Sequence, residues 1–143
     1  MKKIDLHVHT VSTESDVYFT FDLETLEKYV DVNSLDCIGI TNHNVFDSDN
    51  FNLIIEKFSK SKNNLVLLPG IEIDVKTKNG KGQVLILTDI SNLDEFIYKC
   101  SLVAKELEIS NYNKNKKKKF ITIEKLKEIF FEKNFKEKII CIP

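Results

Sequence analysis

The chain opens with a strict alternation of apolar and polar side chains over residues 4–9. A period of two residues is typical of a half-buried strand, so we expect the first strand here. Its polar face carries Asp5, His7 and His9. Residues two apart on an extended strand point to the same side, which would place the two imidazoles next to each other. The pattern therefore predicts a strand whose polar face carries chemistry.

Short apolar runs bounded by turn residues predict the remaining strands. The run that ends at Ile40 delivers Thr41-Asn42-His43-Asn44 at its C-terminal end. The long third strand contains Pro69-Gly70, which favours a bend or bulge because proline lacks an amide donor and glycine is permissive. Asn79-Gly80-Lys81-Gly82 predicts a hairpin turn between two antiparallel strands. The expected strands cover residues 35–40, 65–77, 83–88 and 138–142.

Apolar residues recur at helical spacing in four segments between these strands. Asp22 can cap the first helix, which ends near Asn33. Ser48 or Asp49 can cap the second, which stops before Lys60. The last two helices cover residues 92–109 and 122–134. Strands that alternate with helices in this way indicate an α/β fold.

Composition narrows the function classes. A chain of 143 residues fits one domain, and 42% hydrophobic residues with a net charge of -1 describe neither a polycation nor a disordered acidic chain. All 21 basic residues are lysine, so a phosphate group would be bound by lysine, backbone amides or metal rather than by an arginine fork. Three separated cysteines, Cys37, Cys100 and Cys141, predict reduced buried thiols. With no apolar leader and no membrane-length apolar run, we expect a cytoplasmic protein.

The three histidines, His7, His9 and His43, all lie on an expected strand or at its C-terminal edge. A lone histidine on a strand is commonly a core residue, but the His-x-His spacing favours a pair of metal ligands. Glu72 alternates with two isoleucines, so it is either a solvated strand residue or a carboxylate able to bridge two cations. A carboxylate such as Asp5 commonly fixes the tautomer of a metal-bound imidazole. The pattern favours a metal site.

Three motifs, in this order, resemble those of the PHP family, the polymerase and histidinol phosphatase domain. Asp5-Leu6-His7-Val8-His9-Thr10 is similar to its first motif, Thr41-Asn42-His43-Asn44 to its second and Gly70-Ile71-Glu72 to its third. The resemblance implies a distorted (β/α)7 TIM-like barrel with up to three divalent metal ions, such as Zn, Mn or Fe, at the C-terminal ends of its strands. It also implies hydrolysis of phosphate esters or phosphodiesters.

Carried over by position, the resemblance implies a role for each metal ligand. His7, His9 and Glu72 would hold a first ion, and Glu72 would bridge to a second. His43 would serve a third ion, assisted from the first loop by Asp16. The expected metal ligands are therefore His7, His9, Asp16, His43 and Glu72.

Further positions are assigned around these ligands. Glu14 is the alternative to Asp16. Asp5 and Asn42 would contact the ligating side chains without contacting the metal. Asn42 departs from the family pattern, which usually has Asp there. Gln83 stands at about the place where many members have another metal-binding histidine, which puts the second ion in doubt.

The length of the chain also departs from the family pattern, because members continue beyond a strand like the one that ends before Pro143. We therefore expect residues 1–143 to form one PHP-like domain that is incomplete at its C-terminus, from a truncated or split protein. A partner could then be the missing C-terminal half, supplied by a second chain, or an ATPase domain of the kind fused to some PHP modules. We expect no membrane partner.

Two functions follow from these expectations. The first is a metal-dependent phosphoesterase that uses metal-activated water on a phosphorylated small molecule or a nucleic acid, with the activity of the truncated chain alone left open. The rival is a degenerate PHP module with a structural or regulatory role in a larger ATPase-containing protein or complex. The lysine run at residues 114–119, between Tyr112 and Phe120, is either a nucleic-acid contact or a solvated loop.

Overall fold

The computed structural model describes residues 1–13, 16, 18–61, 64–112 and 120–143, without the side chains of residues 108–112. Its strands are β1 (Ile4–Val8), β2 (Cys37–His43), β3 (Val66–Thr77), β4 (Gly80–Thr88), β5 (Ile121–Thr122) and β6 (Ile139–Ile142). Its helices are α1 (Leu23–Asn33), α2 (Ser48–Ser61), α3 (Leu93–Tyr112) and α4 (Ile123–Phe130), with short 3₁₀ turns η1 (Ile90–Asn92) and η2 (Lys136–Lys138). The lysine run predicted as a loop or nucleic-acid contact lies outside the described residues.

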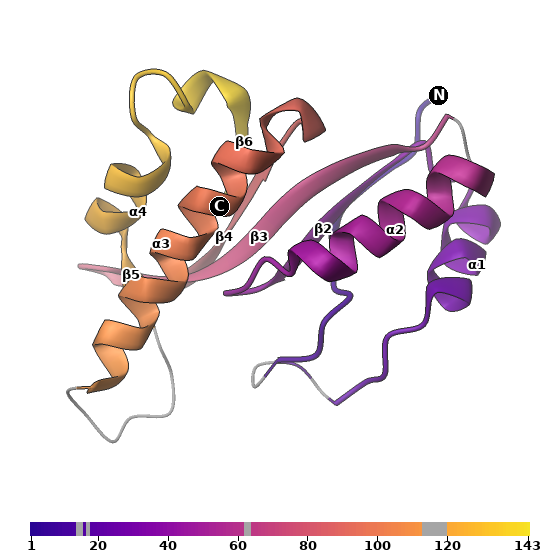
Figure 1. Ribbon diagram of the computed structural model, residues 1–143. Coiled ribbons are helices and arrows are strands. Elements are labelled where there is room, and N and C mark those ends of the chain that lie inside the picture. The colour runs from indigo at the N-terminus through magenta and orange to yellow at the C-terminus, as the bar shows by residue number, and fades with distance from the viewer. Residues whose placement is uncertain (14–15, 17, 62–63, 113–119) are drawn as a thin grey trace.

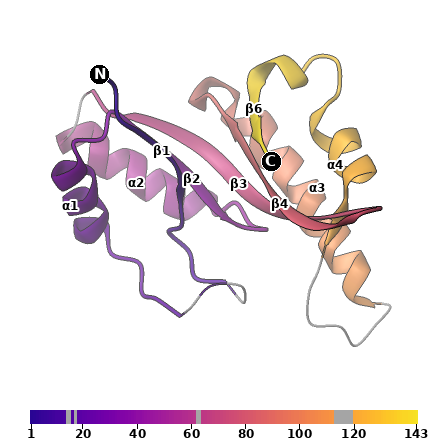
Figure 2. The same ribbon diagram turned by 180° about the vertical axis from the view of Figure 1, so that it is seen from behind.

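The strands form one sheet in the order β1-β2-β3-β4-β6, with the short β5 paired to β3. β1, β2 and β3 are parallel, whereas β4 runs antiparallel to both β3 and β6. The sheet curls like part of a barrel wall, and α2 and α3 lie over one of its faces (Figure 1). Seen from behind, the strands lie in front of these two helices (Figure 2). The chain is therefore a mixed α/β fold with a curled, half-barrel sheet.

β3 continues unbroken through Pro69, where the sequence predicted a bend or bulge, and its register with β2 has no shift. The Glu72 carbonyl accepts a hydrogen bond from the Asn44 amide beyond the end of β2. Because backbone groups alternate sides along a strand, Pro69 faces away from β2. Pairing with β4 begins only at Gly70, opposite Leu87. The structure has no bulge there, because the missing amide of Pro69 removes no hydrogen bond from either ladder.

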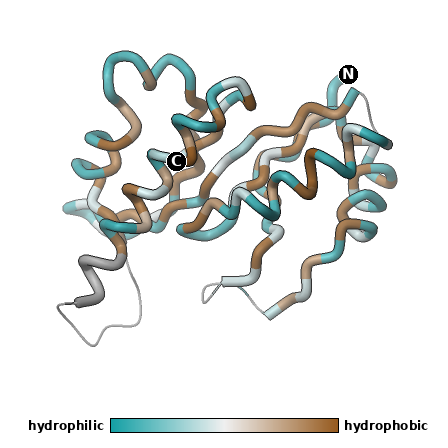
Figure 3. Tube along the Cα trace, viewed as in Figure 1, coloured by the Kyte–Doolittle hydropathy of each residue, from teal (hydrophilic) through white to brown (hydrophobic). Residues whose placement is uncertain are grey.

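The core consists of two apolar clusters that meet at Phe46. One cluster joins β2 to α1 and α2, and the other joins β3 and β4 to α3 and α4. The ring of Phe46 lies 5.4 Å from that of Phe51 in the first cluster and 5.3 Å from that of Phe96 in the second. Hydrophobic residues accordingly concentrate along β3 and the helix faces turned toward it (Figure 3). The two clusters make one continuous structure.

The fourth helix is shorter than predicted and ends at Phe130 instead of continuing to residue 134. The chain turns after Phe131, and Phe135 then enters the core fully buried. The rings of Phe130 and Phe135 lie 6.5 Å apart. A longer helix would carry Phe135 away from this position, so burial of one aromatic ring overrides the helical pattern.

The cysteines are all free, as expected, but only one of them is buried. Burial raises the pKa of the Cys100 thiol well above its ordinary value, which keeps that thiol protonated. Cys141 is exposed because it lies on β6 at the end of the strand order. Across the residues the structure describes, none of the helices has the length and apolar character needed to span a bilayer.

Candidate metal centre

Three parallel strands bring polar side chains to one edge of the sheet. His43 is the last residue of β2 and is paired with Glu72 of β3. His9 follows immediately after β1, and His7 lies near the end of that strand. Because the three strands are parallel, the C-terminal ends of β1 and β2 lie beside Glu72 in the middle of β3, and the three histidines and the glutamate meet there as the sequence predicted. We call these four residues, His7, His9, His43 and Glu72, the His–Glu cluster.

One carboxylate oxygen lies at the middle of the His–Glu cluster. The Nε2 atoms of His7, His9 and His43 lie 3.2, 3.1 and 3.1 Å from Oε2 of Glu72. His7 and His9 also approach each other, with their Nε2 atoms 3.1 Å apart. The side chain of Glu72 is only 2% exposed, whereas that of His7 is 49% exposed. The cluster is therefore anchored on a buried carboxylate and open to solvent at His7.

The three contacts of the imidazoles with Oε2 of Glu72 do not correspond to hydrogen bonds. Oε2 of Glu72 and Nδ1 of His43 are both buried and have no hydrogen-bond partner among the described residues. The three nitrogens are thus close to Oε2, but their orientation does not suit donation to it. Orphaned polar atoms are costly in a protein interior, and an unfilled ion site is one of the accepted explanations for them. The donor set of three imidazoles and one carboxylate fits Zn, Mn or Fe.

Asp16 hydrogen-bonds to His9, and it lies close enough to His43 for the two to share an ion, the arrangement that the resemblance implied. Its Oδ1 lies 2.8 Å from Nδ1 of His9, and its Oδ2 accepts hydrogen bonds from the amide and hydroxyl of Thr13 at 3.0 and 2.7 Å. Partial burial opposes ionisation of Asp16, but the bonds from Thr13 and His9 outweigh it and lower its pKa. The ionised carboxylate holds Nδ1 of His9 and so turns Nε2 toward Glu72. A second set of potential ligands, His9, Asp16 and His43, lies close enough to share an ion. Glu14, the alternative to Asp16, lies outside the described residues.

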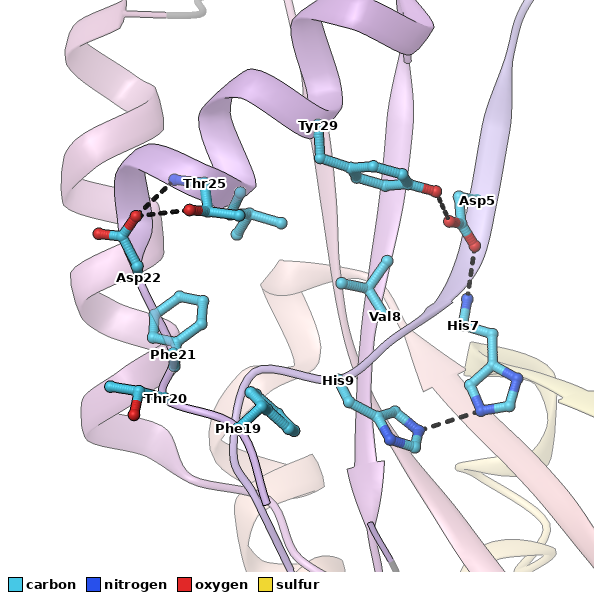
Figure 4. Close-up of a pocket in the computed structure, with 11 residues that line it drawn as sticks. Asp5, His7, Val8, His9, Phe19, Thr20, Phe21, Asp22, Thr25 and Tyr29 are labelled. Atoms are coloured by element: carbon cyan, nitrogen blue, oxygen red, sulfur yellow. Dashed lines mark hydrogen bonds between the residues drawn. The ribbon is translucent and has the colours of Figure 1, made fainter. Parts of the chain in front are cut away.

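Asp5 supports the cluster through the backbone. Its Oδ1 accepts a hydrogen bond from the amide of His7 at 3.0 Å, and its Oδ2 accepts one from the hydroxyl of Tyr29 (Figure 4). This hydrogen bond is the main cause of a raised pKa of Tyr29. The contact with an imidazole that the sequence suggested is not made. The β1–β2 register shifts between Asp5 and Val8, which breaks the regular alternation on which that expectation depended.

Asn42 likewise acts on the backbone and is buried. Its side-chain oxygen accepts hydrogen bonds from the amides of Thr10 and Val11 at 2.6 and 2.9 Å. These bonds fix the path of the chain just after His9. An amide oxygen accepts them as a carboxylate would, so Asn in place of Asp keeps this contact.

Sequence reasoning assigned no role to Asn44 and Asp74, which lock the end of β2 to β3. Asn44 has a φ of 56°, and its amide donates to the Glu72 carbonyl at 2.6 Å. Its side chain donates to the buried Asp74 carboxylate and accepts from the Asp74 amide, both at 3.0 Å. Gln83 donates to the same carboxylate at 3.3 Å. An asparagine directly after a strand is the available signal, since asparagine tolerates the left-handed conformation.

Two cavities flank His7. One of about 350 Å³ lies between the end of β1, the loop at residues 19–22 and α1, and includes both His7 and His9 in its lining. The other, of about 420 Å³, is lined by His7, Glu72, Gln83, Leu85, Ile142 and Pro143. The cluster is thus accessible to a small molecule from two sides.

Comparisons with known proteins add little. No protein-family model matches the sequence, and no curated protein is similar enough to count as a relative. The chain superposes on the crystal structure of a proposed metal-dependent phosphoesterase from Bifidobacterium adolescentis with 19% identity and a TM-score of 0.49. The match covers 92% of this chain and 44% of that one, so the chain spans less than half the length of that protein. A likeness at this level carries no argument about function.

Proposed function

We propose that the His–Glu cluster binds a divalent metal ion and that the protein is a metal-dependent phosphoesterase of the PHP type. The observation that carries the proposal is the meeting of three imidazole nitrogens around one buried, unpartnered carboxylate oxygen. Nitrogen and oxygen donors in this combination favour Zn, Mn or Fe over Mg or Ca, which prefer oxygen alone.

Each residue at the site would have its own role in binding the metal ion. His7, His9 and His43 bind through Nε2, and Glu72 binds through Oε2. Asp16 keeps His9 in the tautomer that leaves Nε2 free, because the Asp16 carboxylate occupies Nδ1. A bound divalent ion would supply Lewis acidity and lower the pKa of a water molecule to about 7. The substrate would reach the site at His7, the most exposed member of the cluster.

The rival function, a degenerate module with a structural or regulatory role, has one supporting observation. By the family resemblance, Gln83 stands at about the place of another metal-binding histidine. Its side-chain amide donates a hydrogen bond to the Asp74 carboxylate. The two proposals differ in the consequence of metal binding, because only the enzyme turns over substrate. An ATPase domain or a chain completing the barrel would be partners under either proposal.

Phosphatase assays test the proposed activity. Purified protein with added Mn²⁺ should hydrolyse p-nitrophenyl phosphate or an oligonucleotide, and His9→Ala should abolish the hydrolysis. Lys125→Ala, a change on the exposed face of α4, is the matched control and should retain the wild-type rate. Activity that survives His9→Ala unchanged would show that hydrolysis arises elsewhere. Metal binding without hydrolysis would favour the structural role.

A further inference from the structure

The cavity of about 350 Å³ beside His7 and His9 has a lining that the proposed chemistry does not explain. In Figure 4, Val8 lies between Tyr29 and His9, Phe19 lies near His9, and Phe21 lies on the side of Asp22. Its volume falls in the ordinary range for small-molecule pockets, about 300–1,000 Å³. The cavity is therefore large enough for one or two aromatic rings placed next to the His–Glu cluster.

Aromatic side chains in this cavity are held open to solvent. Phe19 is 39% exposed and Tyr29 is 40% exposed, and neither belongs to the buried core. Phe21 and Val8 pack against the core cluster of α1 and α2, so they form a fixed apolar wall. Exposed aromatic rings that face such a wall gain contacts when a planar group enters between them.

The charged groups of this cavity would repel an anion. Apart from the two histidines, the charged residues that line it are Asp5 and Asp22, and no lysine is among the described lining residues. Asp22 caps α1 by accepting from the Glu24 and Thr25 amides, and its pKa is lowered chiefly by the hydrogen bond from the Thr25 hydroxyl. Asp5 accepts from His7 and Tyr29. Both carboxylates accept local hydrogen bonds and so provide no cation site, and Lys28, outside the lining, partly offsets the charge of the exposed Asp22.

We propose that this cavity binds the organic part of the substrate, and that the substrate is a small phosphate monoester whose organic part is aromatic or apolar and uncharged. The proposal rests on the proposed function, because it assumes that the phosphoryl group lies at the His–Glu cluster. It narrows the substrate from phosphate esters in general, and it disfavours bisphosphates and nucleic acid, whose further phosphates would meet Asp5 and Asp22.

Kinetics on three substrates test the selectivity. With Mn²⁺ added, the wild type should have a KM for 1-naphthyl phosphate about 10-fold below that for glycerol 3-phosphate, and should turn over thymidine 3′,5′-bisphosphate poorly. Phe19→Ala should raise the KM for 1-naphthyl phosphate about 10-fold, with kcat little changed and the KM for glycerol 3-phosphate unaffected. Thr20→Lys, which adds a cation to the wall, should improve the bisphosphate selectively. Leu53→Ala, an exposed apolar residue on α2, is the matched control.

A binding measurement separates this proposal from the proposed function. Saturation-transfer NMR with 1-naphthol, which has no phosphate, should show contact with the metal-free wild type and much weaker contact with Phe19→Ala. If 1-naphthol binds in this way but no phosphate ester is hydrolysed, the proposed function fails and the cavity assignment stands. If glycerol 3-phosphate or an oligonucleotide is hydrolysed as readily as 1-naphthyl phosphate, and Phe19→Ala changes neither KM nor 1-naphthol binding, the cavity assignment is overturned while the phosphoesterase survives.

Discussion

The N-terminal part of the molecule, through β3, and the C-terminal part, from β4 onward, differ in what they place at the ends of their strands. Each packs helices over the sheet through its own apolar cluster, and the two clusters contain comparable rows of Phe, Ile, Leu and Val. In the N-terminal part, however, the parallel strands β1 and β2 end beside Glu72 of β3, and the whole His–Glu cluster lies there.

The C-terminal part reverses direction twice, from β3 to β4 and from β4 to β6. β6 therefore runs in the same direction as β3 and reaches the same edge, where Ile142 and Pro143 line a cavity with His7 and Glu72. Its buried charged side chain is Lys99, whose Nζ lies 2.8 Å from Oε2 of Glu132. The difference shows that packing and chemistry are separable here, since one part carries the cluster and the other carries half of the core.

The largest expected effect comes from the buried carboxylate at the centre of the cluster. Glu72→Ala should lower the affinity for Mn²⁺ or Zn²⁺ by more than the roughly 100-fold that loss of an outer partner can cost. Isothermal titration calorimetry measures this directly. Glu72→Gln, which keeps the size of the side chain, should lose affinity as well, since an amide is a poorer ligand. Unchanged affinity in both variants would remove Glu72 from the site.

A core substitution in the C-terminal part should lower the free energy of unfolding and leave metal binding unchanged. Phe130 is fully buried between Phe96 and Phe135. Phe130→Ala should therefore lower the free energy of unfolding by about 3–5 kcal/mol, measured by urea denaturation. At a temperature where the variant is still folded, its metal stoichiometry should equal that of the wild type. Loss of metal from the folded variant would mean that the two parts are coupled.

Substitution of Asp16 should have a smaller effect on metal affinity. Asp16→Asn removes the negative charge that faces Nδ1 of His9 and should weaken metal binding about 10–100-fold by calorimetry. Because the pKa of Asp16 is lowered in the folded protein, the stability from its carboxylate is present above its ordinary pKa and is lost as pH falls through the lowered value. The wild type should therefore lose more stability than Asp16→Asn as the pH falls below about 4, the ordinary pKa of an aspartate. Identical acid profiles would contradict this role.

The junction between β2 and β3 should give the smallest effect. Asn44→Ala leaves the buried Asp74 without two partners and places alanine at a φ of 56°, so unfolding should become easier by about 1–3 kcal/mol. Asn44→Gly keeps the backbone conformation accessible and should recover the part of the loss that is due to φ. Equal stability of the three proteins in urea would show that this junction is not needed to hold His43 beside Glu72.

The sequence predicted the meeting of the cluster because that outcome depends on strand direction alone. His43 at the end of β2 is paired with Glu72 on the neighbouring parallel strand β3, and neither needs a special loop to reach the other. The contact of Asp5 was predicted less well, because it depends on an irregular register. The hydrogen bond between Asp16 and His9 was not predicted, because it depends on the fold of a loop. No periodic pattern carries such information.

The cavity at Phe19 and Tyr29 could not be predicted from the sequence either. Tyr29 fits the apolar stripe of a helix, and only the structure shows that its hydroxyl donates to Asp5 and that its ring stays exposed. At Phe135, burial of the ring overrode a helical pattern. At Pro69 the strand has no bulge, because the missing amide faces away from β2 and pairing with β4 begins only at Gly70.

Elemental analysis tests the central claim most directly. Wild-type protein incubated with Zn²⁺, Mn²⁺ or Fe²⁺ and then desalted should retain metal in stoichiometric amount with the chain, and the double variant His9→Ala/His43→Ala, treated in parallel, should retain almost none. Wild-type protein that emerges free of all three metals, or a double variant that retains as much metal as the wild type, would contradict the assignment of the His–Glu cluster as a metal centre.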